Sequence, residues 1–269
     1  MDRSSHFKDI GGGMKTSASQ VQERIDLRKR FKPNRFSQLV GFSVPVKLAT
    51  RWLTTSSIPK GILVSGDMGT GKSLFAHLLA KAAACMNRPT GGIEPCGNCR
   101  PCEGLAVFSS LDRIGSDVDT DQFIRDVRSL RSGGGGNLFG DHGEWFPVVL
   151  DEIHELPKQA QLRLRAEFDG DWCKSFLIAT SNHPEKIDEA LRDRLQSIHL
   201  LPPMRGDLVK WITTICKEVG INVECADAMA VVVDVCGGRF RAILNLLQQF
   251  HDLDMPLAAK AVRNHAGAA

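Results

Sequence analysis

Three short runs of apolar residues, each followed by polar groups, organise the first two thirds of the sequence. The runs occupy residues 62–65, 146–150 and 175–180, and helical spacing of apolar residues marks the segment 74–80. Apolar strands that alternate with helices are typical of a parallel sheet covered on both faces, whose ligands bind beyond the carboxyl ends of the strands. We therefore predict an α/β domain in which the polar ends of three strands face one site.

The pattern changes to helices alone after Pro202 and Pro203, at 207–219, 226–236 and 239–250. This change predicts two domains, an α/β domain at residues 21–202 and a small all-helical lid domain at 203–269. The first 20 residues carry glycines and serines without apolar periodicity, so we expect a disordered leader at 1–20, with Met14 as an alternative start. Four consecutive glycines within residues 131–137 predict a flexible loop.

The composition excludes few classes of function. The 269 residues include 34 Lys and Arg against 31 Asp and Glu, and the net charge of +3 does not by itself indicate nucleic-acid binding. No apolar run approaches the roughly 20 residues needed to cross a bilayer, and the N-terminal residues lack the apolar core of a signal peptide. We therefore predict a soluble, cytoplasmic protein without a membrane partner.

A glycine-rich segment after the first apolar run carries the clearest chemical signal. It matches the G-x-x-x-x-G-K-[ST] pattern of phosphate-binding loops. Its residues are Gly66, Asp67, Met68, Gly69, Thr70, Gly71, Lys72 and Ser73. In such a loop backbone N–H groups surround phosphate oxygens, the lysine reaches the outer phosphates and the hydroxyl ligates magnesium. The segment predicts a site for ATP and Mg²⁺, with a glycine turn that binds no ligand as the alternative.

Two carboxylates follow the second apolar run directly. Asp151 and Glu152 come after Val148, Val149 and Leu150, where a strand end would hold them near the phosphate-binding loop. We expect Asp151 to orient water on the magnesium ion and Glu152 to polarise the water that attacks the terminal phosphate. The alternative for such a dipeptide is a solvated turn.

Four of the eight cysteines are gathered shortly after the predicted helix of the phosphate-binding loop. Cys85, Cys96, Cys99 and Cys102 have spacings that bring thiolates onto one tetrahedral ion, so we predict a structural zinc site within a module at about residues 85–105. Four free buried thiols and an iron–sulfur cluster are the alternatives. The remaining cysteines lie in apolar stretches and are predicted to be core residues: Cys173, Cys216, Cys225 and Cys236.

With these features in hand, residues 30–249 resemble the clamp-loader ATPases of the AAA+ class, most closely the bacterial tau/gamma motor subunits of DNA polymerase III. The resemblance lies in the segment 30–41, the cysteine module and residues 151–161. It implies a P-loop AAA+ fold, with a zinc module inserted after the P-loop helix. It also implies that the segment containing Val40 partly encloses the adenine.

The resemblance implies three further site residues. Asn182 is similar to the polar residue that senses the terminal phosphate, with Ser181 as the alternative register. Arg194 occupies the position of an arginine that reaches the neighbouring subunit's ATP site, although Asp193 and Leu195 depart from the family motif. The alternative role for Arg194, and also for Arg192, is an ion pair with a surface carboxylate. Arg241 resembles the sensor arginine of the lid, with Arg239 as the competing register or an exposed arginine as the alternative.

The implied function is ATP hydrolysis within an oligomer that drives DNA-replication assembly, such as the loading of a sliding clamp. The implied partners are other AAA+ subunits, primed or double-stranded DNA and a sliding clamp. The alternative is a non-hydrolysing scaffold that uses nucleotide and zinc only to fold or assemble. Clamp-loader subunits continue into a third, collar domain, so we expect either a shortened form or a minimal relative.

Overall fold

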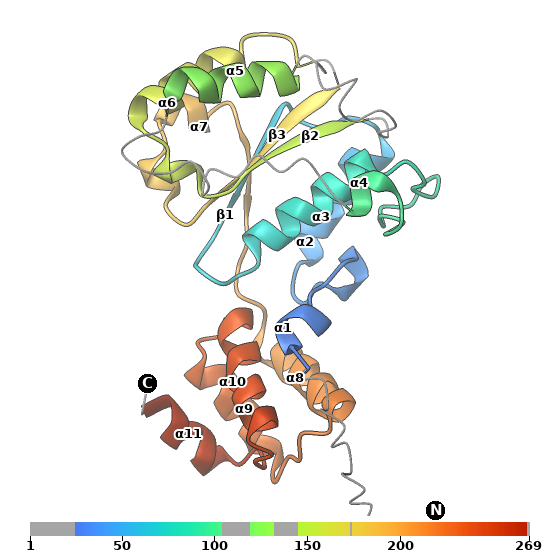
Figure 1. Cartoon of the computed structure of the whole chain (residues 1–269), viewed down its shortest axis with the longest axis vertical. Helices are drawn as coiled ribbons and strands as arrows, with labels where there is room; N and C mark the ends of the chain where they lie inside the picture. The colour runs from blue at the N-terminus through green and yellow to red at the C-terminus, as the bar shows by residue number, and fades with distance from the viewer. Residues whose placement is uncertain (1–24, 104–118, 132–144, 173, 268–269) are drawn as a thin grey trace, which may run out of the picture.

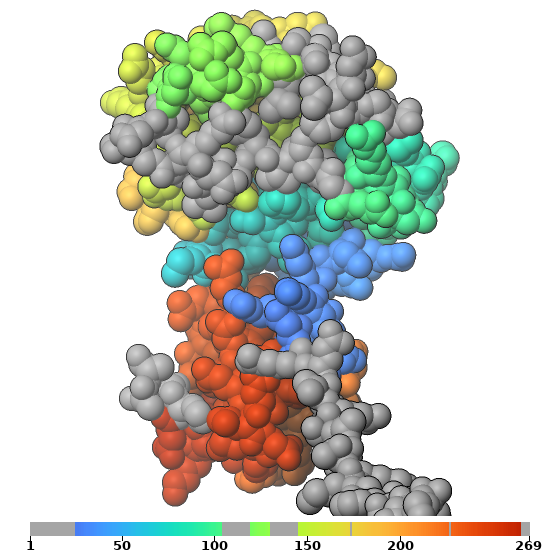
Figure 2. Space-filling view, in the orientation of Figure 1, coloured from blue at the N-terminus to red at the C-terminus, as the bar shows by residue number. Residues whose placement is uncertain are grey.

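The computed structural model describes residues 25–103, 119–131, 145–172 and 174–267. The predicted leader, most of the predicted glycine loop and Cys173 lie outside the described residues. Figure 1 shows a lobe built on a β-sheet and a lobe of helices, and Figure 2 shows the N-terminal part of the described chain at their junction. No helix of the described ranges is long and apolar enough to cross a membrane.

The described residues form one sheet of four parallel strands in the order β2-β3-β1-β4. The strands are β1 (Gly61–Ser65), β2 (Phe146–Leu150), β3 (Ser175–Ser181) and β4 (Gln196–His199). The predicted parallel sheet and its first three strands are confirmed. β4 was not predicted because only Ile198 of its four residues is buried, so it lacks the continuous apolar run of the other strands.

The strand register brings the polar strand ends to one edge of the sheet. Ser65 pairs with Ser181 and Leu150 pairs with Ala179. The phosphate-binding loop after β1, the carboxylates after β2 and Asn182 after β3 therefore start from neighbouring positions. This shared edge creates the candidate site.

Helices cover both faces of the sheet, as the continuous apolar strands predict. Alternate residues of β1 point to opposite faces, so Ile62 and Val64 pack with Phe75 in one core, while Leu63 packs with Phe123 in another. The first core includes residues of α2 (Ser43–Thr54) and α3 (Lys72–Ala84). The second includes residues of α5 (Thr120–Arg131), α6 (Lys158–Glu167) and α7 (Glu189–Arg192).

Short elements connect these layers. They are α1 (Leu27–Arg30), α4 (Arg100–Glu103) and the 3-10 helices η1 (Phe36–Gln38), η3 (Ile153–Glu155) and η4 (Pro184–Lys186). The N-cap of α1 is Asp26, whose carboxylate accepts hydrogen bonds from the amides of Arg28 and Lys29. Leu27 is fully buried in the core of the helical lobe. Its amide donates to the side chain of Gln248 on α10, which in turn donates to the Ile25 carbonyl.

The helical lobe has its own apolar core. Its helices are α8 (Arg205–Val219), α9 (Ala226–Val235), α10 (Phe240–Asp252) and α11 (Ala259–Gly267). The first three correspond to the predicted helices within two residues at each end. α11 was not predicted. Val223 and Leu257 form an isolated parallel β-bridge, which was not predicted either.

Candidate nucleotide-binding site and cysteine cluster

The phosphate-binding loop has a backbone that only glycine adopts without strain. Gly66, Gly69 and Gly71 have φ angles of 146°, 83° and 94°. A Cβ atom on Gly66 would also lie 2.5 Å from the carbonyl oxygen of Leu200. Gly71 leads directly into α3, so the loop ends at the N-terminus of a 13-residue helix. Backbone N–H groups and the helix dipole there favour an anionic ligand.

Lys72 lies at the start of α3 with its side chain largely buried. Its ammonium group donates a hydrogen bond of 2.8 Å to the carbonyl of Asp67, which also accepts from the Thr70 hydroxyl. Burial lowers the pKa of Lys72, while the carboxylates of Glu152, Asp67 and Asp151 oppose that change. The buried ammonium group can pair with a phosphate, whereas the three carboxylates near it favour a cation that binds together with that phosphate.

The two predicted carboxylates are fixed through Thr180, a residue that the sequence analysis did not assign to the site. The buried Thr180 hydroxyl donates to Oδ1 of Asp151 and accepts from the amide of Glu152, each over 3.0 Å. One side chain therefore sets the position of both residues. A polar residue inside the apolar run of β3 was the only sequence signal for this role.

Glu152 has a strained backbone beside the predicted sensor residue. Its φ and ψ angles are 52° and 49°, a left-handed conformation that is uncommon outside glycine and is typical of functional sites. The Asn182 amide group donates to Oε1 of Glu152 over 3.2 Å. Oε2 of Glu152 and Oδ1 of Asn182 are buried and have no hydrogen-bond partner among the described residues. Both side chains line the same cavity.

Ser181, the alternative to Asn182, takes part in a separate buried contact with His154. The Ser181 hydroxyl lies 3.1 Å from Nδ1 of His154, and Nε2 of His154 lies 3.1 Å from a carboxylate oxygen of Glu155. Burial lowers the pKa of His154, and the neighbouring Glu152 and Glu155 oppose that change. Nδ1 of His154 lies 3.4 Å from Oε2 of Glu152, so this histidine contacts the predicted catalytic carboxylate. No role for this histidine was predicted from the sequence.

A cavity of about 380 Å³ extends from the phosphate-binding loop between the two lobes. The sheet edge contributes Glu152 and Asn182 beside the loop residues. The chain between α1 and α2 contributes Pro33, Gln38, Leu39, Val40 and Phe42, and the helical lobe contributes Trp211, Phe240, Arg241 and Leu244. An apolar wall next to a cationic loop matches the two halves of a nucleotide, a base and a polyphosphate.

Aromatic side chains connect the two walls of this cavity. The Phe42 ring packs edge-on against Phe75 of α3 and Phe240 of α10, at centroid distances of 6.2 and 6.4 Å. Phe240 in turn packs against Trp211 of α8 at 5.1 Å. The helical lobe therefore contacts the loop helix through Phe42. Sequence reasoning missed these residues because their spacing within each helix is that of ordinary core positions.

The predicted arginines occupy different surroundings. Arg241 lines the cavity, and the Arg239 side chain passes within 3.5 Å of where a Cβ on Gly69 would lie. Arg194 is outside the residues that line the cavity, and its guanidinium group contacts Asp169 at 3.1 Å and the carbonyl of Ala190 at 2.8 Å. Their roles toward ATP remain predictions.

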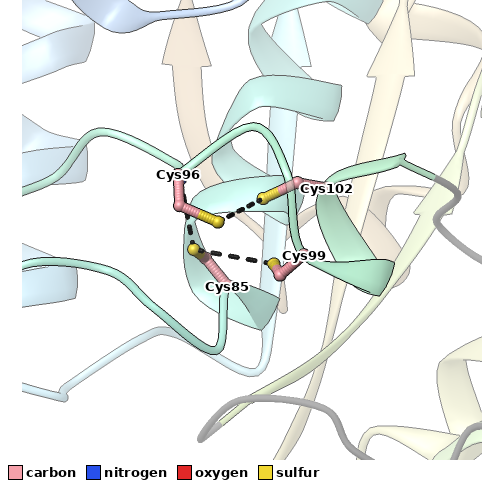
Figure 3. Close-up of side chains that lie close together, drawn as sticks. All are labelled: Cys85, Cys96, Cys99 and Cys102. Carbon is pink, nitrogen blue, oxygen red and sulfur yellow. Dashed lines mark hydrogen bonds between the residues drawn. The ribbon is translucent and has the colours of Figure 1, made fainter.

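The four predicted ligand cysteines meet at the C-terminal end of α3. All four sulfur atoms lie within 4.8 Å of one another, and Figure 3 shows their side chains converging. Three of the cysteines are buried, and the amide of Cys96 donates to the sulfur of Cys85 over 3.3 Å. Four converging thiols form the donor set that structural zinc sites use.

The electrostatics of the cluster differ among its members. The backbone N–H of Asn98 is the main cause that lowers the pKa of Cys96 to about 6, whereas burial raises the pKa values of Cys85 and Cys102. The thiols of Cys85 and Cys102 are therefore costly to ionise without a cation. The residues therefore fit a dication, which stabilises the thiolates it binds.

Residues 145–203 match the model of the ATPase family associated with various cellular activities (AAA). The fold is similar to that of the RuvB Holliday junction branch migration motor of Thermotoga maritima, with a TM-score of 0.61 and 16% identity over 87% of this chain and 71% of that one. The parallel sheet, the phosphate-binding loop and these two matches show a fold of the AAA+ class.

The sequence relatives are more specific. The chain is 28% identical to DNA polymerase III subunit gamma/tau of Mycoplasma genitalium over 224 residues, which are 82% of this chain and 36% of the relative. It is 27% identical to DNA polymerase III subunit tau of Bacillus subtilis over 226 residues, which are 83% and 39%. The chain is thus a homologue of the bacterial gamma/tau subunits, which confirms the predicted resemblance. It spans somewhat more than a third of the length of these relatives.

Proposed function

We propose that the chain hydrolyses ATP as one subunit of an oligomer and that this turnover drives an assembly step of DNA replication. The observation that carries the proposal is that Lys72, Glu152 and Asn182 line one cavity that also has an apolar wall. The cavity offers a cation for the phosphates, a carboxylate for the attacking water and space for a base.

Each polar residue has a distinct part in this proposal. Lys72 holds the outer phosphates, while Ser73 and Asp151 would hold magnesium, which neutralises charge on the phosphates when it is bound. Glu152 orients the attacking water and accepts its proton. Asn182 holds Oε1 of Glu152 in place and lines the cavity beside it.

Lid residues complete the proposed nucleotide site. The guanidinium of Arg241 contacts the phosphates from the helical lobe, and the base lies against the wall that contains Val40. Phe42 packs against both lobes, so nucleotide binding in the cavity fixes their relative position. Nucleotide binding thereby sets where the lid lies relative to the sheet lobe.

We further propose zinc for the cysteine cluster and neighbouring AAA+ subunits for the exposed Arg194. The four sulfurs fill the coordination of a tetrahedral ion, so zinc would be structural. The similarity to DNA polymerase III gamma/tau subunits supports a role in DNA replication. The resemblance to clamp loaders adds a sliding clamp and primed DNA as the proposed partners. In this assembly Arg194 leaves Asp169 and stabilises charge at the next subunit's site.

ATP turnover against protein concentration, with and without primer-template DNA, tests the proposal. We expect turnover per subunit to rise with concentration and to increase with DNA. Glu152→Gln retains nucleotide binding and loses turnover by about a hundredfold or more, whereas Lys72→Ala loses binding. Equal turnover by Glu152→Gln and the parent protein would refute the mechanism. Tight binding with negligible turnover at every concentration favours the non-hydrolysing scaffold.

A further inference from the structure

Glu94 connects the cysteine module to the nucleotide cavity. Its two carboxylate oxygens accept hydrogen bonds from the backbone amides of Phe36 and Ser37, over 2.7 and 2.8 Å. These amides open the 3-10 helix η1, where free N–H groups require acceptors. A residue 58 positions away in the sequence therefore caps this turn.

The capped turn belongs to a wall of the cavity. Residues 33 and 38–40 of the same segment line the cavity, on either side of the capped amides. The Phe36 ring is buried and packs edge-on against Phe75 of the loop helix at 6.1 Å. Within the capped turn Gln38 also accepts the amide of Asn34 over 2.9 Å. The position of η1 thus fixes where the apolar wall faces the phosphate-binding loop.

The other side of Glu94 is fixed by the cysteine cluster. Pro95 is buried and Cys96, the next residue, contributes a sulfur to the cluster. The Cys96 amide donates to the sulfur of Cys85, the residue that follows α3. Ile93, on the preceding side, packs against the core beneath the sheet. A metal ion on the sulfurs would hold this short segment at Cys96, while the packing of Ile93 holds its other end.

We propose that Glu94 couples metal binding at the cysteine cluster to nucleotide binding in the cavity, by holding η1 in the position that the nucleotide needs. With metal bound, the Cys96 backbone is fixed and the carboxylate reaches both amides. Without metal, the segment 94–96 loosens, the two amides lose their acceptor and the wall no longer faces the base. The inference rests on the proposed nucleotide and zinc sites. Because coupling is reciprocal, bound nucleotide also raises the affinity of the cluster for metal by the same factor.

ADP affinity, measured by calorimetry on the full chain, tests this coupling in four samples. The parent protein and Glu94→Gln are each measured with zinc and after removal of zinc by a chelator. We expect the parent to lose about fivefold or more of its ADP affinity without zinc. Glu94→Gln, which loses one of its two acceptor oxygens, starts with weakened affinity and responds little to zinc. The matched control is Glu103→Gln, an exposed carboxylate in the same module, which keeps the parent's response.

Hydrogen exchange gives a second readout that does not depend on turnover. The amides of Phe36 and Ser37 exchange faster in zinc-loaded Glu94→Gln, while amides of β1 keep their protection, which shows that the variant is folded. The same zinc response of ADP affinity in parent and variant, or unchanged exchange at both amides, overturns the coupling. Failure of the zinc-loaded parent to bind ADP overturns the proposed nucleotide site instead. Equilibrium competition for zinc with a chromophoric chelator, with and without ADP, measures the reciprocal effect.

Discussion

The side-chain amide of Asn182 donates a hydrogen bond of 3.2 Å to Oε1 of Glu152. The two residues follow neighbouring strands, β3 and β2, and the other carboxylate oxygen of Glu152 has no hydrogen-bond partner among the described residues. Asn182 thus orients the carboxylate of Glu152.

Replacement of this donor tests its role in turnover. Asn182→Ala is expected to lower kcat by about a hundredfold with little change in ADP affinity, because Glu152 loses its fixed orientation. Steady-state hydrolysis and calorimetry measure the two effects. Ser181→Ala is the control, since its hydroxyl contacts His154 and the amide of His183. A larger loss of kcat in Ser181→Ala would assign the sensor role to Ser181.

Thr180 is expected to be important for stability as well as for the site. Thr180→Val keeps the shape of the side chain but leaves the buried amide of Glu152 without its acceptor. We expect a loss of about 1–3 kcal/mol in the free energy of unfolding, measured by urea denaturation. Thr180→Ser retains the hydroxyl and serves as the matched control. Equal stability of the valine and serine variants contradicts the prediction.

Arg194 distinguishes an intersubunit role from a surface ion pair. The exposed contact with Asp169 contributes about 1 kcal/mol or less to stability, so Arg194→Ala is expected to fold normally. If the guanidinium acts on a neighbouring site, the variant loses about a thousandfold in kcat. Asp169→Ala removes the same ion pair and keeps the arginine, so it retains turnover. Matching losses in both variants would reduce Arg194 to a structural residue.

His154 predicts a stability change at mildly acidic pH. Burial lowers its pKa from 6.5 in the folded protein, against the opposing carboxylates of Glu152 and Glu155; His183 and Lys186 add to the lowering. The unfolded chain therefore binds the proton first, and stability falls as pH drops below about 6.5 toward the folded pKa.

Urea denaturation between pH 5 and 8 measures this dependence. His154→Gln removes the titrating group, so its stability should fall less steeply over the acidic part of the range. At pH 8 the imidazole is neutral in both states, and the comparison there isolates the loss of the Ser181 contact. An unchanged slope in the variant would show that other groups cause the acid sensitivity.

The sequence by itself determined the parts of the site that depend on local spacing. Only a strand and the turn after it are needed to position the loop glycines, Lys72 at the start of α3 and the carboxylates after β2. The cysteine ligands are likewise close in sequence, so their convergence follows from short loops. Apolar runs also predicted three strands, because burial on both faces leaves a continuous pattern.

Only the tertiary structure decided which distant side chains support these groups. Thr180 and His154 look like strand and loop residues in the sequence, and Glu94 is separated from its partner Phe36 by 58 positions. Trp211 and Phe240 have the spacing of ordinary core residues and line the cavity because the helical lobe packs beside it. Hydrogen bonds and packing across such separations depend on the complete fold, which brings together side chains whose chemistry carries no local pattern.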